Sequence, residues 1–422
     1  MSKSVILKKI NQILYNNPIN PYVKEQEKLE AALKLLDIKT EKPHKFWKTQ
    51  PVRQTQSDEF INECIEIKNI DNIKTEPYQI PDGFEWYVMD INDPEEMKKL
   101  YELLKLNYVE DEDCLFRFNY SINFLKWALS PPNWKRDWHL CVRGIKKKNL
   151  LGFISAIPQN VCIHKQKIES VEVNFLCVHR KLRSKHMAPI LIKEITRRVN
   201  LSGIFQAFYT AGIRLPTPIA KCTYYHRSLN CAKLSDVKFY CITKNMNLRR
   251  LIKLNRLPEQ NDSRFVPMGT DHTPQAHELL MNYLKNKNLY PNYNLDEFNY
   301  WFLPQESIVY SYIVKKDDKI TDFISYYLVQ SSVLNNERYD TLTAAYLFFV
   351  INDTLSLNDL VKEALISAKK NGADAFNALD CMENDQFFKE LKFGKGDGNL
   401  HYYAFNWNCS YIDKQNVGMI LL

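Results

Sequence analysis

The chain has 422 residues, of which 45% are hydrophobic and 25% charged, a composition that excludes a disordered or fibrous protein. Only 11 residues are glycine, against about 7% in average proteins, and neither GxxxxGK[ST] nor GxGxxG occurs, which argues against a glycine-rich nucleotide-binding loop. The 57 basic and 49 acidic residues leave a mild net charge of +8, and because the Lys and Arg residues are spread along the chain we expect no nucleic-acid partner.

The ten cysteines include no CxxC pair and show no metal-ligand spacing with histidine. That pattern is typical of reduced, mostly buried thiols in an intracellular protein. The apolar stretch near Met1 is too short for a signal peptide, and nowhere do 18 uncharged apolar residues follow one another. We therefore expect a cytoplasmic protein with no stable membrane insertion and no metal, and a monomer as the default.

Helical and strand patterns alternate along the first part of the chain. Leu29, Ala32, Leu33 and Leu36 fall on one face of an amphipathic helix over 22–38. A polar stretch with the segment HKFWKTQPV at 44–52 follows. The pattern then predicts a strand over 84–89, a helix over 95–106 preceded by Asp90 and Asp93, strands over 139–144, 150–157 and 170–178, and a helix over 188–199.

A similar order of elements recurs later in the chain. The pattern predicts a short strand over 264–268, a helix over 274–285, a hairpin of 307–315 with 319–329, a strand over 344–351 and a helix over 357–370. Strand, helix, hairpin, strand and helix thus occur twice, which indicates an α/β (α+β) fold of two related halves. We expect an N-terminal arm over 1–43, one half over 44–245 and a second half over 246–422.

The loop between the last strand and the helix of each half differs in charge. A helix that opens after a strand presents free backbone N–H groups and the positive end of its dipole, so it binds phosphate readily. In the first half this loop, at 178–188, is rich in Lys and Arg, whereas its counterpart Asn352-Asp353-Thr354 is acidic to neutral. Only the first half therefore suits a polyanionic ligand.

Several segments of the chain resemble one enzyme family. HKFWKTQPV, EVNFLCVHRKLRSKHMAPILIKEITRRVN, FYTAGIRLP, YYHRSLN, FNALDCMEN and KFGKGDGNLHYYAFNW are similar to successive segments of the eukaryotic glycylpeptide N-tetradecanoyltransferases, or N-myristoyltransferases. They lie in the family's order and span residues 44 to 422. The resemblance implies two acetyltransferase-like (GNAT-type) halves, related by a pseudo-twofold axis, around a saddle-shaped mixed sheet.

The resemblance also implies a reaction, in which a C14 acyl group passes from coenzyme A to the α-amine of an N-terminal glycine. It assigns the oxyanion-stabilising amides to Phe175 and Leu176 and the proton acceptor to the terminal carboxylate of Leu422. It places the amine beside Asn174 and Thr210. On the residues alone, Phe175 and Leu176 are as well explained by core packing, and Gly418-Met-Ile-Leu-Leu could be a frayed tail. If those apolar residues are buried, we expect desolvation to raise the pKa of the terminal carboxylate.

For acyl-CoA, the resemblance implies a covering segment and a phosphate-binding loop. Its residues are His44, Lys45, Phe46, Trp47, Leu176, Cys177, Val178, Arg183, Ser184, Lys185, His186, Met187 and Ala188. His186 stands where the family commonly has Arg, and because histidine is only partly charged near neutrality we expect a weaker phosphate contact there.

For the peptide, the resemblance implies an acidic and aromatic groove. Its residues are Tyr108, Val109, Asp111, Asp113, Phe116, Phe118, Tyr120, Tyr209, Tyr224, His226 and Asp380, with Tyr225 where a Trp is common. The three Asp would attract a Lys near the start of the substrate. Alternatively, the acidic run is a solvated turn and His226 a hydrogen-bonded core histidine. The glycines of KFGKGDGNL indicate a tight turn or a close approach to another group.

The sequence thus predicts a protein N-myristoyltransferase whose partners are myristoyl-CoA, as a cosubstrate rather than a resident cofactor, and proteins with an N-terminal glycine. Alternatives that stay open are an acyltransferase of different chain length or acceptor amine, and an acyl-CoA-binding or peptide-binding module without turnover. A nucleic-acid-binding role would rest only on the net charge and the basic run from Arg180 to Lys185.

Overall fold

The computed structural model describes residues 45–55, 60–111, 113–240 and 247–422. The helix expected over 22–38, the arm over 1–43 and His44 lie outside these residues. The chain forms two compact units, Met1–Gln50 and Pro51–Leu422. In the first, residues 47–49 form the 3₁₀ helix η1 (Trp47–Thr49), and the rings of Phe46 and Trp47 meet edge to face at 5.1 Å.

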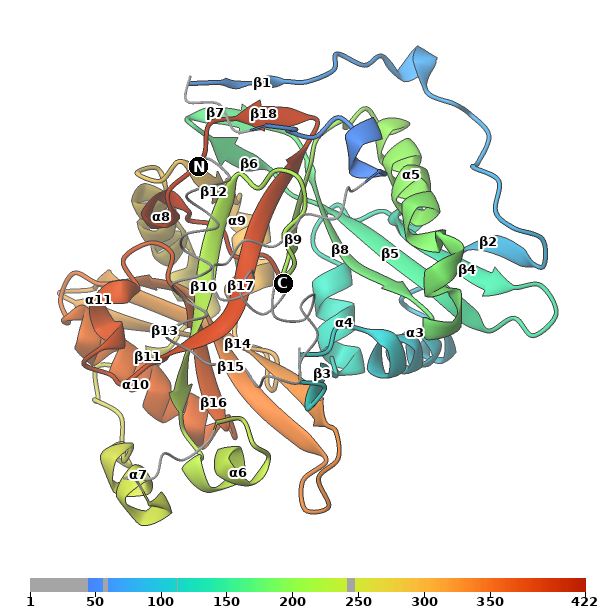
Figure 1. The fold of residues 1–422 in the computed structure, drawn as a ribbon. Helices are drawn as coiled ribbons and strands as arrows, with labels where there is room; N and C mark the ends of the chain where they lie inside the picture. The colour runs from blue at the N-terminus through green and yellow to red at the C-terminus, as the bar shows by residue number, and fades with distance from the viewer. Residues whose placement is uncertain (1–44, 56–59, 112, 241–246) are drawn as a thin grey trace, which may run out of the picture. The chain divides into compact units, whose positions relative to one another are not determined.

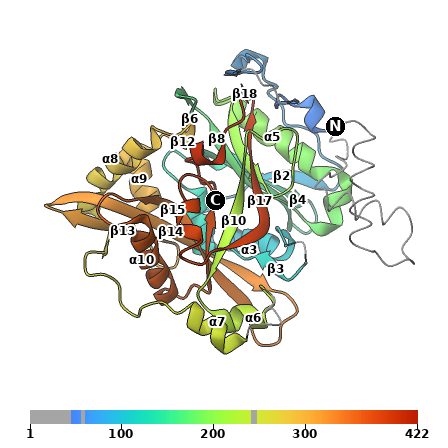
Figure 2. The ribbon, with the colours of Figure 1, turned by 60° about the vertical axis from the view of Figure 1, so that its left-hand side comes forward.

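The second unit contains all other described elements (Figures 1 and 2). Those up to the start of the second predicted half are β1 (Asn62–Cys64), η2 (Ile70–Asn72), β2 (Phe84–Val88), α3 (Pro94–Asn107), β3 (Phe116–Phe118), α4 (Ile122–Leu129), η3 (Arg136–Trp138), β4 (His139–Gly144), β5 (Leu150–Pro158), β6 (Val161–Ile163), β7 (Gln166–Ile168), β8 (Val171–Val178), η4 (Arg180–Lys185), α5 (Met187–Asn200), β9 (Ala207–Ala211), β10 (Ala220–Ser228) and α6 (Cys231–Asp236).

The remaining elements follow residue 247. They are α7 (Leu248–Leu254), β11 (Val266–Pro267), η5 (Thr270–His272), α8 (Thr273–Leu284), β12 (Leu289–Pro291), α9 (Leu295–Phe302), β13 (Val309–Lys316), β14 (Lys319–Val333), β15 (Thr341–Ile351), α10 (Leu357–Lys370), β16 (Ala375–Leu379), α11 (Asp385–Phe388), β17 (Gly394–Phe405), β18 (Trp407–Cys409) and η6 (Lys414–Asn416).

Local sequence explains these elements. The Asp93 carboxylate accepts hydrogen bonds from the Glu95 and Glu96 amides and Pro94 is the first residue of α3, so the helix begins where a cap and a proline place it. Asp317 and Asp318 both have positive φ, 49° and 61°, as the tight turn between β13 and β14 requires. β4 and α10 have the predicted bounds, and the other helices and strands predicted within the described residues are present with ends shifted by a few residues.

One thirteen-strand mixed sheet runs through the unit. Its order is β11-β13-β14-β15-β16-β10-β17-β9-β8-β5-β4-β2, with β3 paired to β14. In each half an antiparallel hairpin, β4–β5 or β13–β14, is followed by a strand, a helix and a strand parallel to the preceding one: β8, α5 and β9, or β15, α10 and β16. The predicted mixed α/β fold with a doubled order of elements is confirmed. The boundary at 245–246 stays a prediction.

Strands from the two halves alternate in the middle of the sheet. β17, from the C-terminal part of the chain, lies between β9 and β10 (Figure 1). β10 in turn pairs with β16 of the second half. Residues 51–422 accordingly form a single compact unit.

Helices pack on both faces of this sheet. On β5, Phe153 packs in the same core as α3, whereas Ile154 points to the opposite face and packs with α5. β14 repeats this arrangement, because Phe323 shares the core of α8 and Ile324 that of α10. α3 and α8 thus contribute to one central core, while α5 and α10 cover separate outer cores.

Among the described helices, none has the length and apolar character needed to cross a bilayer. Within the same residues no group of three or more His, Cys, Asp or Glu side chains is arranged to hold a metal ion.

Candidate active site

An irregularity in β8 lies at the centre of the site. Phe153 pairs with Cys177 and Ser155 with Asn174, so Phe175 and Leu176 together face a single residue of β5. Such a two-against-one arrangement is a β-bulge. Phe175 has φ +54°, which is unusual for a bulky residue, and its ring is only 2% exposed. Core packing of the side chain and a redirected backbone amide therefore occur together at Phe175.

Asn174 connects this bulge to the end of the chain. Its Oδ1 accepts a hydrogen bond from the Phe175 amide at 2.7 Å, and its Nδ2 donates to a terminal carboxylate oxygen of Leu422. The same Nδ2 lies 3.2 Å from Oε1 of Glu172. The structure thus brings together three of the predicted catalytic residues, Asn174, Phe175 and Leu422, and adds Glu172.

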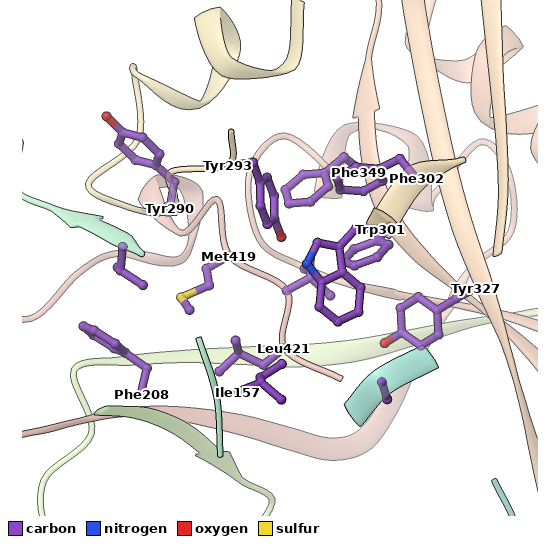
Figure 3. Packing of buried hydrophobic residues seen from close by; sticks show 14 of the residues in the cluster. Ile157, Phe208, Tyr290, Tyr293, Trp301, Phe302, Tyr327, Phe349, Met419 and Leu421 are labelled. Atoms are coloured by element: carbon purple, nitrogen blue, oxygen red, sulfur yellow. The ribbon is translucent and has the colours of Figure 1, made fainter. Parts of the chain in front are cut away.

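The C-terminal tail is buried, as its apolar residues predict. Met419 and Leu421 lie among Ile157, Phe208 and a group of aromatic rings that includes Tyr293 (Figure 3). Burying these side chains stabilises the tail by roughly 1.5–3 kcal/mol each. Leu422 itself is half-buried.

Backbone hydrogen bonds fix the path of the tail. The Gly418 amide donates to the Leu289 carbonyl at 2.8 Å, and the Tyr402 hydroxyl donates to the Met419 carbonyl at 2.8 Å. A Cβ at Gly418 would come within 2.8 Å of Leu284, so the tail passes α8 too closely for a side chain. Thr210, the other residue predicted to hold the amine, pairs with Tyr402 across β9 and β17.

The predicted phosphate loop joins β8 to α5. It forms η4, and His186 follows with φ +54° as the residue preceding α5, without a side-chain cap. Ser184, Lys185 and His186 are exposed, whereas Met187 is buried. The Arg183 guanidinium donates to the backbone carbonyls of Asn107 and Val178. Arg183 thus ties the loop to the end of α3.

The predicted peptide groove divides into an aromatic and an acidic part. Tyr108, Phe118 and Tyr120 form a cluster, in which Phe118 and Tyr120 stack at 5.5 Å and Tyr120 meets Phe175 at 5.3 Å. Burial raises the pKa of the Tyr108 and Tyr120 hydroxyls well above 10, so both stay neutral. This cluster contacts the bulge directly.

The other aromatic residues of the predicted groove pack against further rings. Phe116 packs against Phe239, Tyr209 stacks on Tyr403 at 5.1 Å, and Tyr224 meets Tyr346. Tyr225 points to the opposite face of the sheet, where it stacks on Phe388 at 4.2 Å.

The predicted acidic residues differ in their surroundings. Asp111 and Asp113 are exposed, as is Val109, and the Asp111 side chain accepts a hydrogen bond from the Phe116 amide at 2.6 Å. Asp380 is buried. Its carboxylate accepts from Lys414 Nζ at 2.8 Å and from the Thr223 amide at 2.7 Å. A substrate lysine at Asp380 would therefore have to share it with Lys414.

His226 and the glycine-rich segment meet as the sequence predicts for a close approach. His226 Nδ1 is 2.7 Å from Asn377 Oδ1, and burial lowers its pKa from 6.5. A Cβ at Gly396 would lie 2.3 Å from His226 Nε2 and 3.0 Å from the Tyr224 carbonyl. Gly396 thus allows β17 to pass directly over His226, and the histidine is hydrogen-bonded within the protein.

Two residues near the predicted site, Glu172 and Lys414, were not predicted from the sequence. Glu172 is 5% exposed, and its burial raises the pKa of the carboxyl to about 7, although the Asn174 side chain and the Leu422 amide favour its ionised form. Its signal was a charged residue within the strand sequence VEVNFLCV. Lys414 had no local signal, because its partner Asp380 is brought to it only by the fold.

Comparison with known proteins identifies this arrangement. The sequence profile of the N-terminal domain of myristoyl-CoA:protein N-myristoyltransferase matches residues 64–222, and that of the C-terminal domain matches 236–420. The chain belongs to the N-myristoyltransferase family. It is therefore an acyltransferase of the glycylpeptide N-tetradecanoyltransferase type, and the resemblance seen in the sequence is confirmed.

Individual N-myristoyltransferases match over most of their length. The glycylpeptide N-tetradecanoyltransferase of Drosophila melanogaster is 49% identical over 381 residues, covering 89% of this chain and 80% of the relative. Glycylpeptide N-tetradecanoyltransferase 2 of Danio rerio is 47% identical, covering 96% and 84%. A crystal structure of Saccharomyces cerevisiae N-myristoyltransferase with bound myristoyl-CoA has a TM-score of 0.87 at 37% identity, covering 90% of this chain and all of that one.

Proposed function

We propose that this N-myristoyltransferase transfers the tetradecanoyl group of myristoyl-CoA to the α-amine of an N-terminal glycine and releases coenzyme A. The observation that carries the proposal is the hydrogen bond from Asn174 to the terminal carboxylate of Leu422, one residue before the bulge at Phe175 and Leu176. A proton acceptor and redirected backbone amides thereby come together in a largely buried place.

In the proposed reaction the terminal carboxylate of Leu422 takes a proton from the glycine ammonium. The freed amine, held by Asn174 and Thr210, attacks the thioester carbonyl, and the new C–N bond forms as charge develops on the carbonyl oxygen. The Leu176 amide donates to that oxygen, and so does the Phe175 amide once it exchanges its hydrogen bond to Asn174 Oδ1 for one to the substrate, a contribution of about 2.7–4 kcal/mol for one such donor in other acyl-transfer enzymes. The C–S bond then breaks, and the second proton of the attacking nitrogen passes to the leaving sulfur, so that the amide forms and coenzyme A is released as the thiol. No covalent acyl-enzyme is needed.

Coenzyme A binding is assigned to the loop from η4 to the start of α5. The exposed Ser184, Lys185 and His186 offer backbone amides and positive charge at the N-terminal end of α5, where a phosphate is favoured. Because Arg183 is bonded to Asn107 and Val178, its guanidinium holds the loop in place. Leu176, Cys177 and Val178 would lie along the pantetheine, and His44, Lys45, Phe46 and Trp47 would cover the acyl-CoA.

The peptide is proposed to bind along the aromatic cluster and the acidic loop. Tyr108, Phe118 and Tyr120 would flank its first residues beside the bulge. Asp111 and Asp113 are exposed and would attract a lysine of the substrate. We also propose that the enzyme acts as a monomer in the cytoplasm and needs no metal.

Thiol release from myristoyl-CoA tests this function. The assay uses a peptide that begins Gly-x-x-x-Ser, with a matched peptide that begins with Ala as the control. Turnover with the glycine peptide alone is the expected result. Equal turnover with both peptides would contradict the assigned acceptor, and binding of myristoyl-CoA without turnover would indicate a binding module instead.

A further inference from the structure

Glu172 is a buried acid for which the reaction described above has no use. It lies on β8, between Ile157 of β5 and Phe208 of β9, both of which are core residues. An isolated carboxylate in such a place is costly unless hydrogen bonds compensate for its lost hydration. Among the described residues, no Lys, Arg or His forms an ion pair with Glu172. Its compensation must therefore come from neutral donors.

One side-chain donor reaches Glu172, and it also contacts the proposed proton acceptor. Asn174 Nδ2 lies 3.2 Å from Oε1 of Glu172, and the backbone amide of Leu422 favours the ionised form of this carboxyl. The Asn174 amide group also donates to the terminal carboxylate. Asn174 thus bridges Glu172 and Leu422.

We propose that Glu172 is a positioning residue for the terminal carboxylate: by accepting a hydrogen bond from the Asn174 side chain, which also donates to Leu422, it orients the proton acceptor toward the substrate amine. This inference rests on the proposed function.

Because Glu172 can gain or lose a proton, its positioning role should appear in the pH dependence of kcat. The Asn174 side chain and the Leu422 amide favour the ionised form of Glu172, whereas burial raises its pKa to about 7. The titratable groups that interact with Glu172 are Tyr108 after α3, Tyr293 after β12 and Tyr327 on β14. Burial raises the pKa of all three tyrosines above 10, so they stay neutral between pH 6 and 9. A change of activity near pH 7 from this cluster therefore belongs to Glu172 or to the terminal carboxylate.

The test compares the full-length enzyme with Glu172→Gln, which keeps the shape of the side chain but cannot lose a proton. With the glycine peptide, we expect kcat to fall about tenfold at pH 8 while the Kd for myristoyl-CoA is unchanged. In the wild type, kcat should fall as the pH is lowered through about 7. That fall should be weaker in Glu172→Gln. The matched control is Glu297→Gln, which changes another buried Glu, in the cap of α9, and should keep the wild-type profile.

A double-mutant cycle separates positioning from a general structural role. Two residues added after Leu422 remove the terminal carboxylate from its place, so Glu172→Gln should then cost little further kcat. If the tenfold loss persists in the extended chain, the inference is wrong. It is equally wrong if Glu172→Gln retains the kcat and pH profile of the wild type, or if its loss lies in myristoyl-CoA binding.

A second variant covers the case in which the first does not fold. If Glu172→Gln does not fold, as judged by thermal unfolding, Glu172→Asp replaces it. This variant retains an ionisable group, so the inference predicts a lower kcat that still falls as the pH is lowered, and a pH-independent kcat would overturn it. Absence of turnover in the wild type would instead contradict the proposed function.

Discussion

The two halves of the sheet contain the same strand–loop–helix connection, but its loop has a different role in each. In the second half, the loop between β15 and α10 surrounds an acid of the protein itself. The backbone amides of Asp353, Thr354 and Leu355 donate to the carboxylate of Asp322, at 3.2, 3.2 and 2.9 Å, and Asp322 is fully buried. A loop at the start of a helix attracts an anion, and here the carboxylate of Asp322 is that anion.

The first half has no such acid. The last pair of β5 with β8 is Gly152 with Val178, and the last pair of β14 with β15 is Phe323 with Ile351. The preceding residues, Leu151 and Asp322, therefore occupy matching positions. Because a leucine side chain accepts no hydrogen bond, we expect the first loop to be available for an anion from outside. In this interpretation, the residue type at one position decides whether the connection serves stability or ligand binding.

The central bulge shows the same contrast. β15 also contains an extra residue, Phe348, between the pairs of Ser325 and Tyr326. Among the described residues of the two bulges, only Phe175 has a positive φ. The second half thus repeats the irregularity without the redirected amide, and its contribution to the proposed chemistry is the chain end.

The largest expected effect follows from extending that end. Adding two residues after Leu422 should lower kcat with the glycine peptide by about 1,000-fold, because a positioned base contributes 10²–10⁴-fold, while myristoyl-CoA still binds. The same two residues added before Met1 serve as the control. Unchanged turnover of the C-terminally extended chain would remove Leu422 from the mechanism.

An acid placed in the first half, at the position that matches Asp322, should weaken phosphate binding by the β8–α5 loop. Leu151→Asp places a carboxylate beside the β8–α5 connection, where it should compete with phosphate and raise the Kd for myristoyl-CoA about 100-fold, the loss of roughly 2.7 kcal/mol. Leu151→Asn has nearly the same size without the charge, and its effect should be much smaller. Equal effects of the two variants would argue that packing, not charge, is responsible.

Removing the acid from the second half should affect stability alone. In Asp322→Asn the side-chain amide cannot accept all the hydrogen bonds from the loop, so the free energy of unfolding should drop by about 2 kcal/mol. Urea denaturation measures this, with exposed Asp353→Asn as the control on the same loop. We expect the kcat of the folded variant to stay at the wild-type level. A large loss of kcat would mean that the second loop also takes part in the reaction.

The acidic loop with Asp111 and Asp113 leads into β3, which pairs with β14 of the second half. This loop therefore connects the two halves. Changing both Asp111 and Asp113 to Asn should raise KM about tenfold for peptides with a lysine near their start, since each exposed charge pair is worth up to about 1 kcal/mol. Peptides without that lysine provide the comparison, and the difference should shrink at high salt. An equal rise in KM for both peptides would contradict charge recognition.

The smallest expected effect concerns His186. His186→Arg places a permanent charge at the start of α5 and should tighten coenzyme A binding about threefold, because the site is exposed. Calorimetry with coenzyme A measures this difference. No change would place the phosphates elsewhere on the loop.

Much of the fold could be predicted from local pattern. Alternation and caps such as Asp93 gave the helices and longer strands, and the doubled order of elements gave the two halves. Strand order could not be predicted, because the place of β17 between β9 and β10 depends on contacts between distant parts of the chain. The short strands β1, β3, β6 and β7 have too few residues for a pattern.

Only part of the candidate site could be predicted, again because some of its contacts join distant parts of the chain. The apolar end of the chain indicated burial of the tail, and the burial is confirmed. The ion pair of Asp380 with Lys414 depends on tertiary contacts, so a residue assigned to the substrate lies against a lysine of the protein. The roles of the site residues stay predictions until the variants are measured.

The position of β17 bears on how the molecule is made. β9 and β10 follow each other closely in the sequence, yet each pairs with β17 rather than with the other. During synthesis, both strands therefore leave the ribosome before β17 has been translated. Until β17 is available, each of them has an unpaired edge. Such long-range pairing slows folding and exposes edges to aggregation. Chains that end prematurely would therefore be lost to aggregation or degradation, rather than accumulate as inactive enzyme.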